Sequence, residues 1–268
     1  MTLKKKNNAE LATTPAAVPT VPLQFDQPLS GVVAFATRRG EAGVSAYSSF
    51  NCCPYVGDDP AHVDDCRRAL LKSLRIDPSQ LKTLRQVHSV RVVAADEASP
   101  TVEADAVVTN RPGEYVGVYT ADCVPILLVD PIAGIAAAAH AGWKGTLGGI
   151  ATLTVEKMTS LGADVERIHA TFGPAICGGC YEVGQELIDR FAEERFPMER
   201  ISRVNPTTAK PHIDLVEANV VLLERVGIAA EHISRSNICT RCAPDTYFSA
   251  RALGVQSGRV LTAIAIVR

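Results

Sequence analysis

Three side chains that can bind a soft metal ion stand at the ends of strand-like segments. His88 lies in LRQVHS, Cys123 in YTADCVP and His140 in AAAAHAGW. Strand ends and the loops beyond them are where a rigid scaffold presents functional groups. Two imidazoles and one thiolate suit zinc in a tetrahedral site, and three protein ligands leave the fourth position open. One interpretation of these residues is therefore a single catalytic zinc ion per chain, with copper as the alternative metal.

An open zinc site would supply a nucleophile or an electrophile at neutral pH. The metal lowers the pKa of a bound water toward about 7, or polarises a substrate oxygen. Asp122, beside the thiolate, is the residue that we expect to orient a ligand or move a proton. Two other interpretations fit the same residues: unrelated core residues, or a metal-free cysteine hydrolase in which His140 activates Cys123. The spacing leaves all three open.

Short runs of apolar and β-branched residues indicate the strands that position these groups. The runs are GVVAFA from Gly31, VRVVAA from Val90, ADAVVT from Ala104, YVGVYT from Tyr115, VPILLVD from Val124, GIAAAAH from Gly134 and RVLTAIAIV from Arg259. Several runs follow one another through short turns, without strict alternation with helices. We therefore expect an α+β fold in which mixed β-sheets pack in layers with helices on the outside.

Three helices are predicted from apolar periodicity and end signals. The first carries Leu147 on its apolar face and ends at Gly162, the second includes Val183 to Phe191, and the third runs from Asp214 to Gly227 with a capping-box-like start. Asn219 falls on the apolar stripe of the third helix, where an unsatisfied amide would cost about 1 to 3 kcal/mol. We expect it to bond to a backbone group in preference to a substrate.

Composition and charge exclude several classes of protein. The chain has 268 residues, of which 47% are apolar, and residues 28–268 are expected to form a single domain behind a flexible tail at residues 1–27. A net charge of -2 offers no basic field, so nucleic acid is not an expected partner. No export signal or membrane span is recognised, and a cytoplasmic location away from the membrane is expected.

A series of motifs occurs in a fixed order along the chain. It consists of QVH at 86–88, ADAVVT at 104–109, TADC at 120–123, AHAGW at 139–143, GPAI with CYEVG through Gly184, and YFSAR at 247–251. Together these motifs resemble the YfiH-like, or laccase-domain, family, described as purine nucleoside phosphorylases and as multicopper polyphenol oxidases. The resemblance covers about residues 31–268 and implies a YfiH-like, cysteine hydrolase-like fold. It also implies that His88, Cys123 and His140 are zinc ligands.

The resemblance implies the phosphorolysis of adenosine, inosine, guanosine or methylthioadenosine, with adenosine deamination as a companion activity. Purine nucleoside and phosphate are thus the expected partners. Phosphorolysis needs cationic donors for phosphate, and Arg251 within YFSAR is the best placed, followed by Arg85 and Lys144. Trp143, next to His140, could stack on a purine or pack over a neighbouring strand.

The expected enzyme is therefore a transferase and hydrolase with Cys123, Asp122 and Arg251 as its catalytic residues. A copper-dependent polyphenol oxidase, or laccase, is the first rival, because the same ligands bind copper. The sequence shows no second His-rich cluster, which argues against it. The other rivals are a metal-free cysteine hydrolase that acts on cell-wall precursors through a covalent Cys123 intermediate, and a binding module without enzymatic activity.

The eight cysteines are expected to be reduced, because a chain with an ample core and no export signal does not need a disulfide framework. Two pairs, Cys177 with Cys180 and Cys239 with Cys242, have the spacing of a structural zinc site with four cysteine ligands. The family resemblance supplies no second zinc and places these cysteines near the main pocket. It favours free thiols that line or back the cleft.

Overall fold

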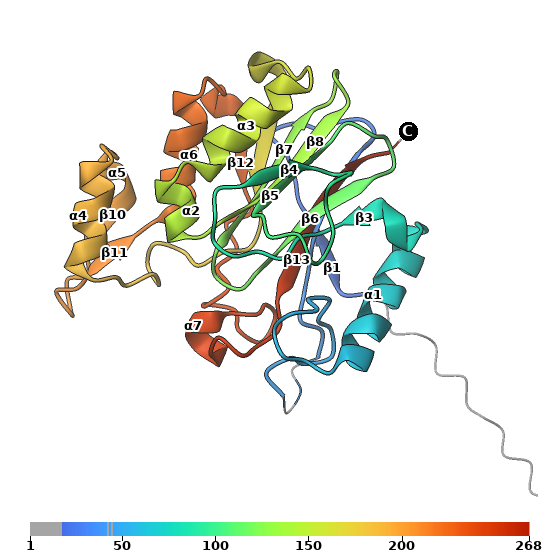
Figure 1. Ribbon diagram of the computed structural model, residues 1–268. Helices are drawn as coiled ribbons and strands as arrows, with labels where there is room; N and C mark the ends of the chain where they lie inside the picture. Colours follow the sequence, from blue (N-terminus) through green and yellow to red (C-terminus); the bar gives the residue numbers. More distant parts are fainter. Residues whose placement is uncertain (1–17, 42, 44, 268) are drawn as a thin grey trace, which may run out of the picture.

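The computed structural model describes residues 18–41, 43 and 45–267, in which two β-sheets lie face to face. One apolar cluster, with members such as Val118 and Leu127, fills the space between the sheets. Helices cover the outer faces, with α3 and α6 on one side of the sheets and α1 on the other (Figure 1). The layers therefore confirm the predicted α+β fold with mixed sheets inside and helices outside.

The two sheets are both mixed. The first has the order β1-β2-β13-β6-β3 and is antiparallel except at the β3–β6 pair; its strands are β1 (Thr20–Pro22), β2 (Val32–Thr37), β13 (Val260–Ile266), β6 (Tyr115–Thr120) and β3 (Leu81–Lys82). The second has the order β12-β9-β7-β8-β5-β4, with parallel pairs at its two edges; its strands are β12 (Ile233–Arg235), β9 (His169–Phe172), β7 (Val124–Asp130), β8 (Ile135–Ala141), β5 (Ala106–Thr109) and β4 (Val92–Ala94). A separate antiparallel pair joins β10 (Ser202–Val204) and β11 (Pro211–Ile213). The seven predicted runs are β2, β4, β5, β6, β7, β8 and β13.

The helices lie on the outer faces and at the ends of the sheets. They are α1 (Pro60–Leu74), α2 (Trp143–Leu147), α3 (Ile150–Ser160), α4 (Gln185–Glu193), α5 (Met198–Ile201), α6 (Leu215–Arg225) and α7 (Ala250–Leu253). Short 3₁₀ helices span Pro78–Gln80, Val165–Arg167 and Ala230–His232. The pair β10 and β11 stands with α4 and α5 at one end of the molecule (Figure 1).

Strand β8 is a run of alanines buried on both faces. Ala137 and Ala139 face the helices, whereas Ala136 and Ala138 face the first sheet, because successive side chains of a strand alternate. Small side chains let both neighbouring layers approach this strand closely. Its last residues therefore lie at a fixed place in the middle of the fold, and one of them is His140.

The helix expected to end at Gly162 is two helices. Gly149 has φ +78°, a left-handed conformation that glycine adopts without strain, and it separates α2 from α3. Sequence analysis missed α1, although Asp59 caps it, Pro60 occupies its first turn and Leu70 lies on its buried face.

The third predicted helix is α6. Asp214 caps it by accepting a hydrogen bond from the Glu217 N–H at 3.0 Å. The Glu217 carboxylate does not complete a capping box, because it pairs with Arg200 and Arg235. Asn219 has the expected backbone partner: its Nδ2 donates to the Leu215 carbonyl at 2.8 Å and also to Thr146 Oγ1 at 2.9 Å. This amide ties α6 to α2.

The tail predicted at residues 1–27 includes residues that belong to the folded domain. Residues 1–17 lie outside the described residues, but β1 pairs with β2 and Leu23 is buried in the core. Prolines obscured this strand in the sequence. They are compatible with it because β1 is an edge strand, where an N–H can be absent without breaking a ladder.

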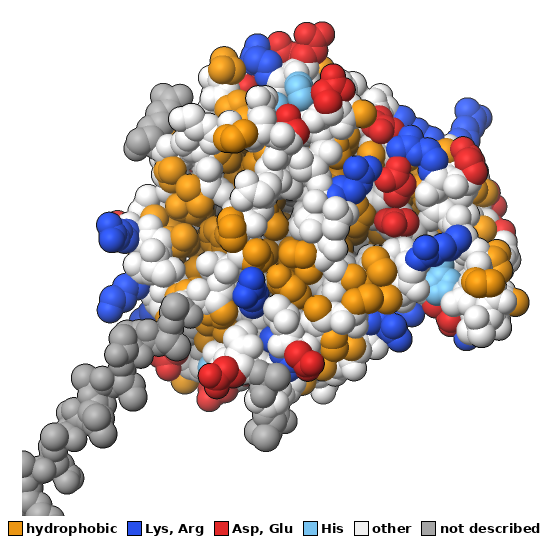
Figure 2. Space-filling model, turned by 180° about the vertical axis from the view of Figure 1, so that it is seen from behind, with side chains coloured by type: hydrophobic (Ala, Val, Ile, Leu, Met, Phe, Trp, Pro, Cys, Tyr) orange, Lys and Arg blue, Asp and Glu red, His pale blue; other side chains and the backbone are white. Residues whose placement is uncertain are grey.

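Among the described residues, no helix is long and apolar enough to cross a membrane. Figure 2 shows the face opposite to that of Figure 1, on which apolar side chains gather near the centre and charges of both signs are interspersed around them. This face therefore carries no continuous basic surface of the kind that binds nucleic acid.

The close packing of β8 predicts a marked penalty for a larger side chain there. Ala139→Leu should lower the free energy of unfolding by about 1 to 3 kcal/mol, because the fully buried position has no room for the added carbons. Ala133→Leu, in the exposed turn before β8, is the control and should change stability by less than about 0.5 kcal/mol. Urea unfolding measures both, and equal stabilities would contradict the packing described.

Candidate metal centre

His88, Cys123 and His140 converge on one point, as their residue types predict. One ligand atom from each lies within 4.8 Å of the others, and Cys123 Sγ is 3.7 Å from His88 Nε2. The two imidazole rings are 4.8 Å apart between centroids and nearly perpendicular. His140 is buried, Cys123 is partly buried and His88 is exposed. A metal ion held by these three atoms would be reachable from one side.

The pairing of β7 with β8 places two of the three residues. Val124 is opposite Ala141 in this antiparallel pair, so Cys123 and Gly142 come together just beyond the strand ends. A Cβ on Gly142 would lie 2.8 Å from His88 Cδ2 and 3.1 Å from Cys123 Sγ. Glycine is required at this position because the converging side chains leave no space, and its φ of −75° is one that any residue adopts.

Asp105 is the functional residue that sequence analysis missed. It is fully buried immediately before β5, and its Oδ1 accepts a hydrogen bond from His140 Nδ1 at 2.8 Å. The same oxygen accepts from the His88 N–H at 3.1 Å, and Oδ2 accepts from the Ser89 N–H and Oγ at 2.6 and 2.7 Å. Asp105 lies within the ADAVVT motif, but only the pairing of β5 with β8 shows which histidine it contacts.

The bond to Asp105 sets the orientation of His140. With Nδ1–H directed at the carboxylate, Nε2 is left to face the metal position, as in carboxylate–histidine–metal arrangements. Burial raises the pKa of Asp105, but its hydrogen bonds with His140 and Ser89 outweigh burial and hold that pKa below its usual range. The carboxylate is therefore ionised at neutral pH.

Two residues beside the centre have left-handed backbone conformations that are unusual for side chains with a Cβ. His88 has φ +60° and Asp122 has φ +87°. Such conformations cost of order 1 to 3 kcal/mol and persist where the surroundings enforce them. The hydrogen bonds of the His88 and Ser89 N–H groups to Asp105 enforce the left-handed conformation of His88. Strain at this place accords with a functional site.

The charges of the centre favour a thiolate. Burial raises the pKa of the Cys123 thiol, but His140 and His88 outweigh it and lower that pKa to about 6. Burial lowers the pKa of His140, but Cys123 and Asp105 together raise it to about 9. Without a metal, the pair is thus a thiolate beside an imidazolium. The thiolate is the form that binds metal and also the form that acts as a nucleophile.

A pocket of about 270 Å³ opens over the centre. Its walls are formed by Val87, His88, Asp122, Cys123, Trp143, Lys144, Ile176, Tyr181 and Leu215. Trp143 also packs against the core, as one of its two expected roles requires, and lies under the cations of Lys144 and Arg190; its stacking on a purine stays a prediction. The pocket offers aromatic surface and positive charge beside the metal position.

The three predicted phosphate-binding cations differ in their placement. Lys144 lines the pocket. The Arg251 guanidinium lies over the Tyr181 ring, 5.3 Å from its centroid, and donates to the Glu182 carbonyl at 3.1 Å, which places it beside the pocket wall. Arg85 pairs with Glu103 on an exposed surface, and neither arginine is among the residues that line the pocket.

Asp122 joins three segments of the pocket wall. Its Oδ1 accepts from Thr240 Oγ1 at 2.6 Å, and its Oδ2 accepts from the Arg251 N–H at 2.7 Å. Its carbonyl accepts from the Ile176 N–H at 2.9 Å. The carboxylate is therefore engaged in positioning Arg251.

A second histidine-containing group lies elsewhere, although the sequence showed no second His-rich cluster. Asp26, His169 and His232 each offer one ligand atom within 4.8 Å of the others, and His169 Nδ1 is 2.7 Å from Asp26 Oδ1. These residues are distant in sequence, which is why local spacing did not reveal them.

Comparisons with known proteins agree with the order of motifs. A family model described as multi-copper polyphenol oxidoreductase laccase matches residues 32–267. The chain is 46% identical over 253 residues to adenosine deaminase RL5 from an unknown prokaryotic organism, covering 90% of this chain and 97% of that protein. It is 39% identical over 251 residues to a purine nucleoside phosphorylase of Deinococcus radiodurans, covering 93% and 95%. The crystal structure of the hypothetical protein YfiH of Bacillus licheniformis matches with a TM-score of 0.79 and 29% identity, covering 88% of this chain and 92% of that one.

The position of Asp105 predicts a large loss of stability when its charge is removed. Asp105→Asn should lower the free energy of unfolding by about 3 to 5 kcal/mol in chelator-treated protein, because the amide leaves buried donors unpaired beside His140. Asp96→Asn, at an exposed position, is the matched control and should have little effect. Chemical denaturation measures both variants, and wild-type stability for Asp105→Asn would contradict the role of Asp105 as an anchor.

Proposed function

Because the chain belongs to the multi-copper polyphenol oxidoreductase laccase family, we propose that it is a zinc-dependent purine nucleoside phosphorylase with adenosine deaminase activity. Adenosine, inosine, guanosine and methylthioadenosine are the proposed nucleosides, phosphate is the co-substrate and the cytoplasm is the proposed location. Relatives named for the two activities cover nearly the whole chain and support the reaction class. The observation that carries the proposal is the convergence of His88, Cys123 and His140 under a pocket with aromatic and cationic walls.

The donor set fits a zinc ion. One thiolate and two imidazoles meet within 4.8 Å, the buried Asp105 orients one imidazole, and Gly142 leaves the necessary space. Bound there with its fourth position open, zinc would supply Lewis acidity for activating water or polarising a substrate oxygen.

The other residues of the pocket bind and orient the substrates. Burial raises the pKa of Tyr181 to about 12, so its hydroxyl keeps its proton and can donate a hydrogen bond to a nucleoside. Trp143 offers a ring on which a purine can stack. Lys144, in the pocket lining, and Arg251, beside the pocket wall over Tyr181, supply the positive charge that phosphate needs, and Asp122 holds the backbone N–H of Arg251 in place.

Phosphorolysis breaks the bond between the purine and the ribose, and a phosphate oxygen takes the place of the base on the sugar. The cations must therefore hold phosphate close to the sugar, while the pocket wall fixes the base. Deamination needs water at the purine ring and no phosphate. The two reactions thus make different demands on Arg251 but share the centre formed by His88, Cys123 and His140.

Copper-dependent oxidation of phenols is the second candidate. The description of the family favours it, and the group of Asp26, His169 and His232 supplies a second set of potential ligands. Such an oxidase would need several copper ions, so an analysis of metal content distinguishes it from the first proposal.

The first test combines metal content with turnover. Protein of known metal content is incubated with adenosine, with and without phosphate, and base, phosphorylated ribose and inosine are quantified. We expect zinc, release of adenine only with phosphate, and formation of inosine without it. Cys123→Ala should lose both reactions by about a hundredfold or more, since even outer partners of metal ligands cost about 10- to 100-fold. Cys66→Ala, on α1, is the control.

Other outcomes of this test would overturn the proposal. Full activity after removal of all metal, together with inactivation by thiol alkylation, would indicate a cysteine hydrolase that uses the Cys123–His140 pair. Copper in the active protein, with oxidation of phenols and no turnover of nucleosides, would indicate the oxidase.

The placement of Arg251 predicts that its substitution impairs phosphorolysis much more than deamination. Arg251→Ala should raise the KM for phosphate by about 10- to 100-fold, since a charge-assisted hydrogen bond contributes about 1.5 to 3 kcal/mol. Deamination without phosphate should change far less. Arg85→Ala is the control, because Arg85 pairs with Glu103 on an exposed surface, whereas the Arg251 guanidinium lies over the ring of Tyr181, which lines the pocket. Equal effects of the two substitutions on KM would contradict the assignment of Arg251 to phosphate.

A further inference from the structure

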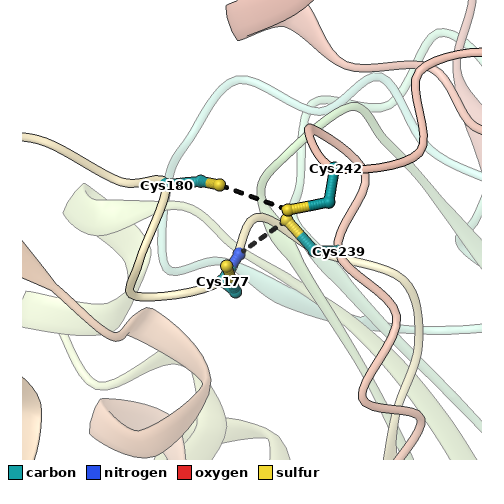
Figure 3. A group of neighbouring side chains, drawn as sticks. All are labelled: Cys177, Cys180, Cys239 and Cys242. Carbon is teal, nitrogen blue, oxygen red and sulfur yellow. Dashed lines mark hydrogen bonds between the residues drawn. The ribbon is translucent and has the colours of Figure 1, made fainter.

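Four cysteines that the proposed reaction does not use gather at a second place. Cys177, Cys180, Cys239 and Cys242 each offer a sulfur atom within 4.8 Å of the others (Figure 3). Cys180 Sγ and Cys242 Sγ are 3.4 Å apart. We propose that these four sulfurs hold a second, structural zinc ion, in place of the free thiols that the sequence favoured.

Each pair of cysteines is presented by a tight turn. In CGGC, the Cys177 carbonyl accepts from the N–H groups of Cys180 and Tyr181 at 2.9 and 3.1 Å. In CTRC, the Cys239 carbonyl accepts from the Ala243 N–H at 3.2 Å. Such turns place two sulfurs on one side of the chain, which is how zinc knuckles present their ligands.

Backbone contacts hold the two turns against each other. Ala175 and Cys239 form a parallel bridge, in which the Ala175 N–H donates to the Ile238 carbonyl and the Thr240 N–H donates to the Ala175 carbonyl, both at 3.1 Å. The Cys177 N–H donates to Cys239 Sγ at 3.3 Å, so one turn already bonds to a sulfur of the other.

Tight packing restricts the first turn as well. A Cβ on Gly178 would lie 2.8 Å from Asp214 Cβ, and one on Gly179 would collide with the Arg203 guanidinium. Gly178 therefore lets this turn lie against the start of α6, whereas at Gly179 the flexible Arg203 side chain could move aside.

The distances between the sulfurs suit zinc better than disulfides. A zinc–sulfur bond is about 2.3 Å, so the edge of a regular ZnS₄ tetrahedron is about 3.8 Å. The Cys180–Cys242 separation of 3.4 Å is close to this value, and no pair of the four sulfurs is more than 4.8 Å apart. A disulfide would require a sulfur separation of about 2.05 Å and would join only two of the four atoms. Four protein ligands close the site, which is the pattern of a structural zinc rather than a catalytic one.

The site would fix one wall of the pocket. Ile176 and Tyr181, which line the pocket, flank the first turn, and Thr240, which donates to Asp122, lies within the second. A zinc ion between the turns would therefore hold the segment bearing Tyr181 against the segment bearing Thr240. This inference stands apart from the proposed reaction, because it concerns metal content and architecture.

Zinc per chain is measured in wild-type protein, in Cys123→Ala and in the double variant Cys180→Ser with Cys242→Ser. We expect two zinc ions in the wild type and one in each variant. The control is the double variant Cys52→Ala with Cys66→Ala, which removes two cysteines outside the cluster and should keep two.

If the Cys180 and Cys242 double variant does not fold, the absorption spectrum of cobalt-loaded protein tests the same site without that variant. Cys123→Ala loaded with Co²⁺ should show the intense charge-transfer absorbance of a tetrahedral site with four thiolates. Absence of that spectrum, with four thiols that react freely in the native protein, would overturn the proposal. A mass reduced by the hydrogens of disulfide formation between Cys180 and Cys242 would also overturn it. Neither readout depends on nucleoside turnover, so failure here and failure of the proposed function are distinguishable.

Discussion

The buried carboxylate of Asp105 constrains the whole centre, because an ionised group without water must keep its hydrogen-bond donors. Its donors come from two separate segments: the loop that carries His88 and Ser89, and strand β8 with His140. The same contacts hold His88 in a left-handed conformation and orient His140, one ring nitrogen of which lies within 4.8 Å of the sulfur of Cys123. Two of the three potential metal ligands are thus positioned by one side chain that does not itself face the pocket.

The strands and loops extend this constraint to the third ligand and to the pocket. The register of β7 with β8 brings Cys123 to the same place, and Gly142 leaves room for it. On the opposite side, Asp122 joins the segments of Ile176, Thr240 and Arg251. The four-cysteine cluster connects two of these segments again. The hydrogen bonds of Asp122 therefore hold the segments of the pocket wall together and, in our proposal, a second zinc ion between the cysteines adds a further link.

The sequence was most informative about features that depend on neighbouring residues, such as the apolar runs of the strands and the short motifs that carry the potential ligands. Runs of β-branched residues and alanines predicted the central strands, and the order of motifs, through the family that it resembles, predicted that His88, Cys123 and His140 would meet. Asp105 could not be assigned, because its partner is determined by the pairing of β5 with β8. The strand β1 was obscured by its prolines, and one predicted helix is divided by a left-handed glycine at Gly149. The missed helix α1 did carry a local signal in Asp59 and Pro60.

The most direct test of the account is anomalous X-ray diffraction at the zinc absorption edge, from crystals of the protein grown with zinc. We expect an anomalous peak about 2.0 to 2.1 Å from one imidazole nitrogen of His88 and from His140 Nε2, and about 2.3 Å from Cys123 Sγ, with the Asp105–His140 bond intact. A zinc-replete crystal with no peak between these three residues would contradict it.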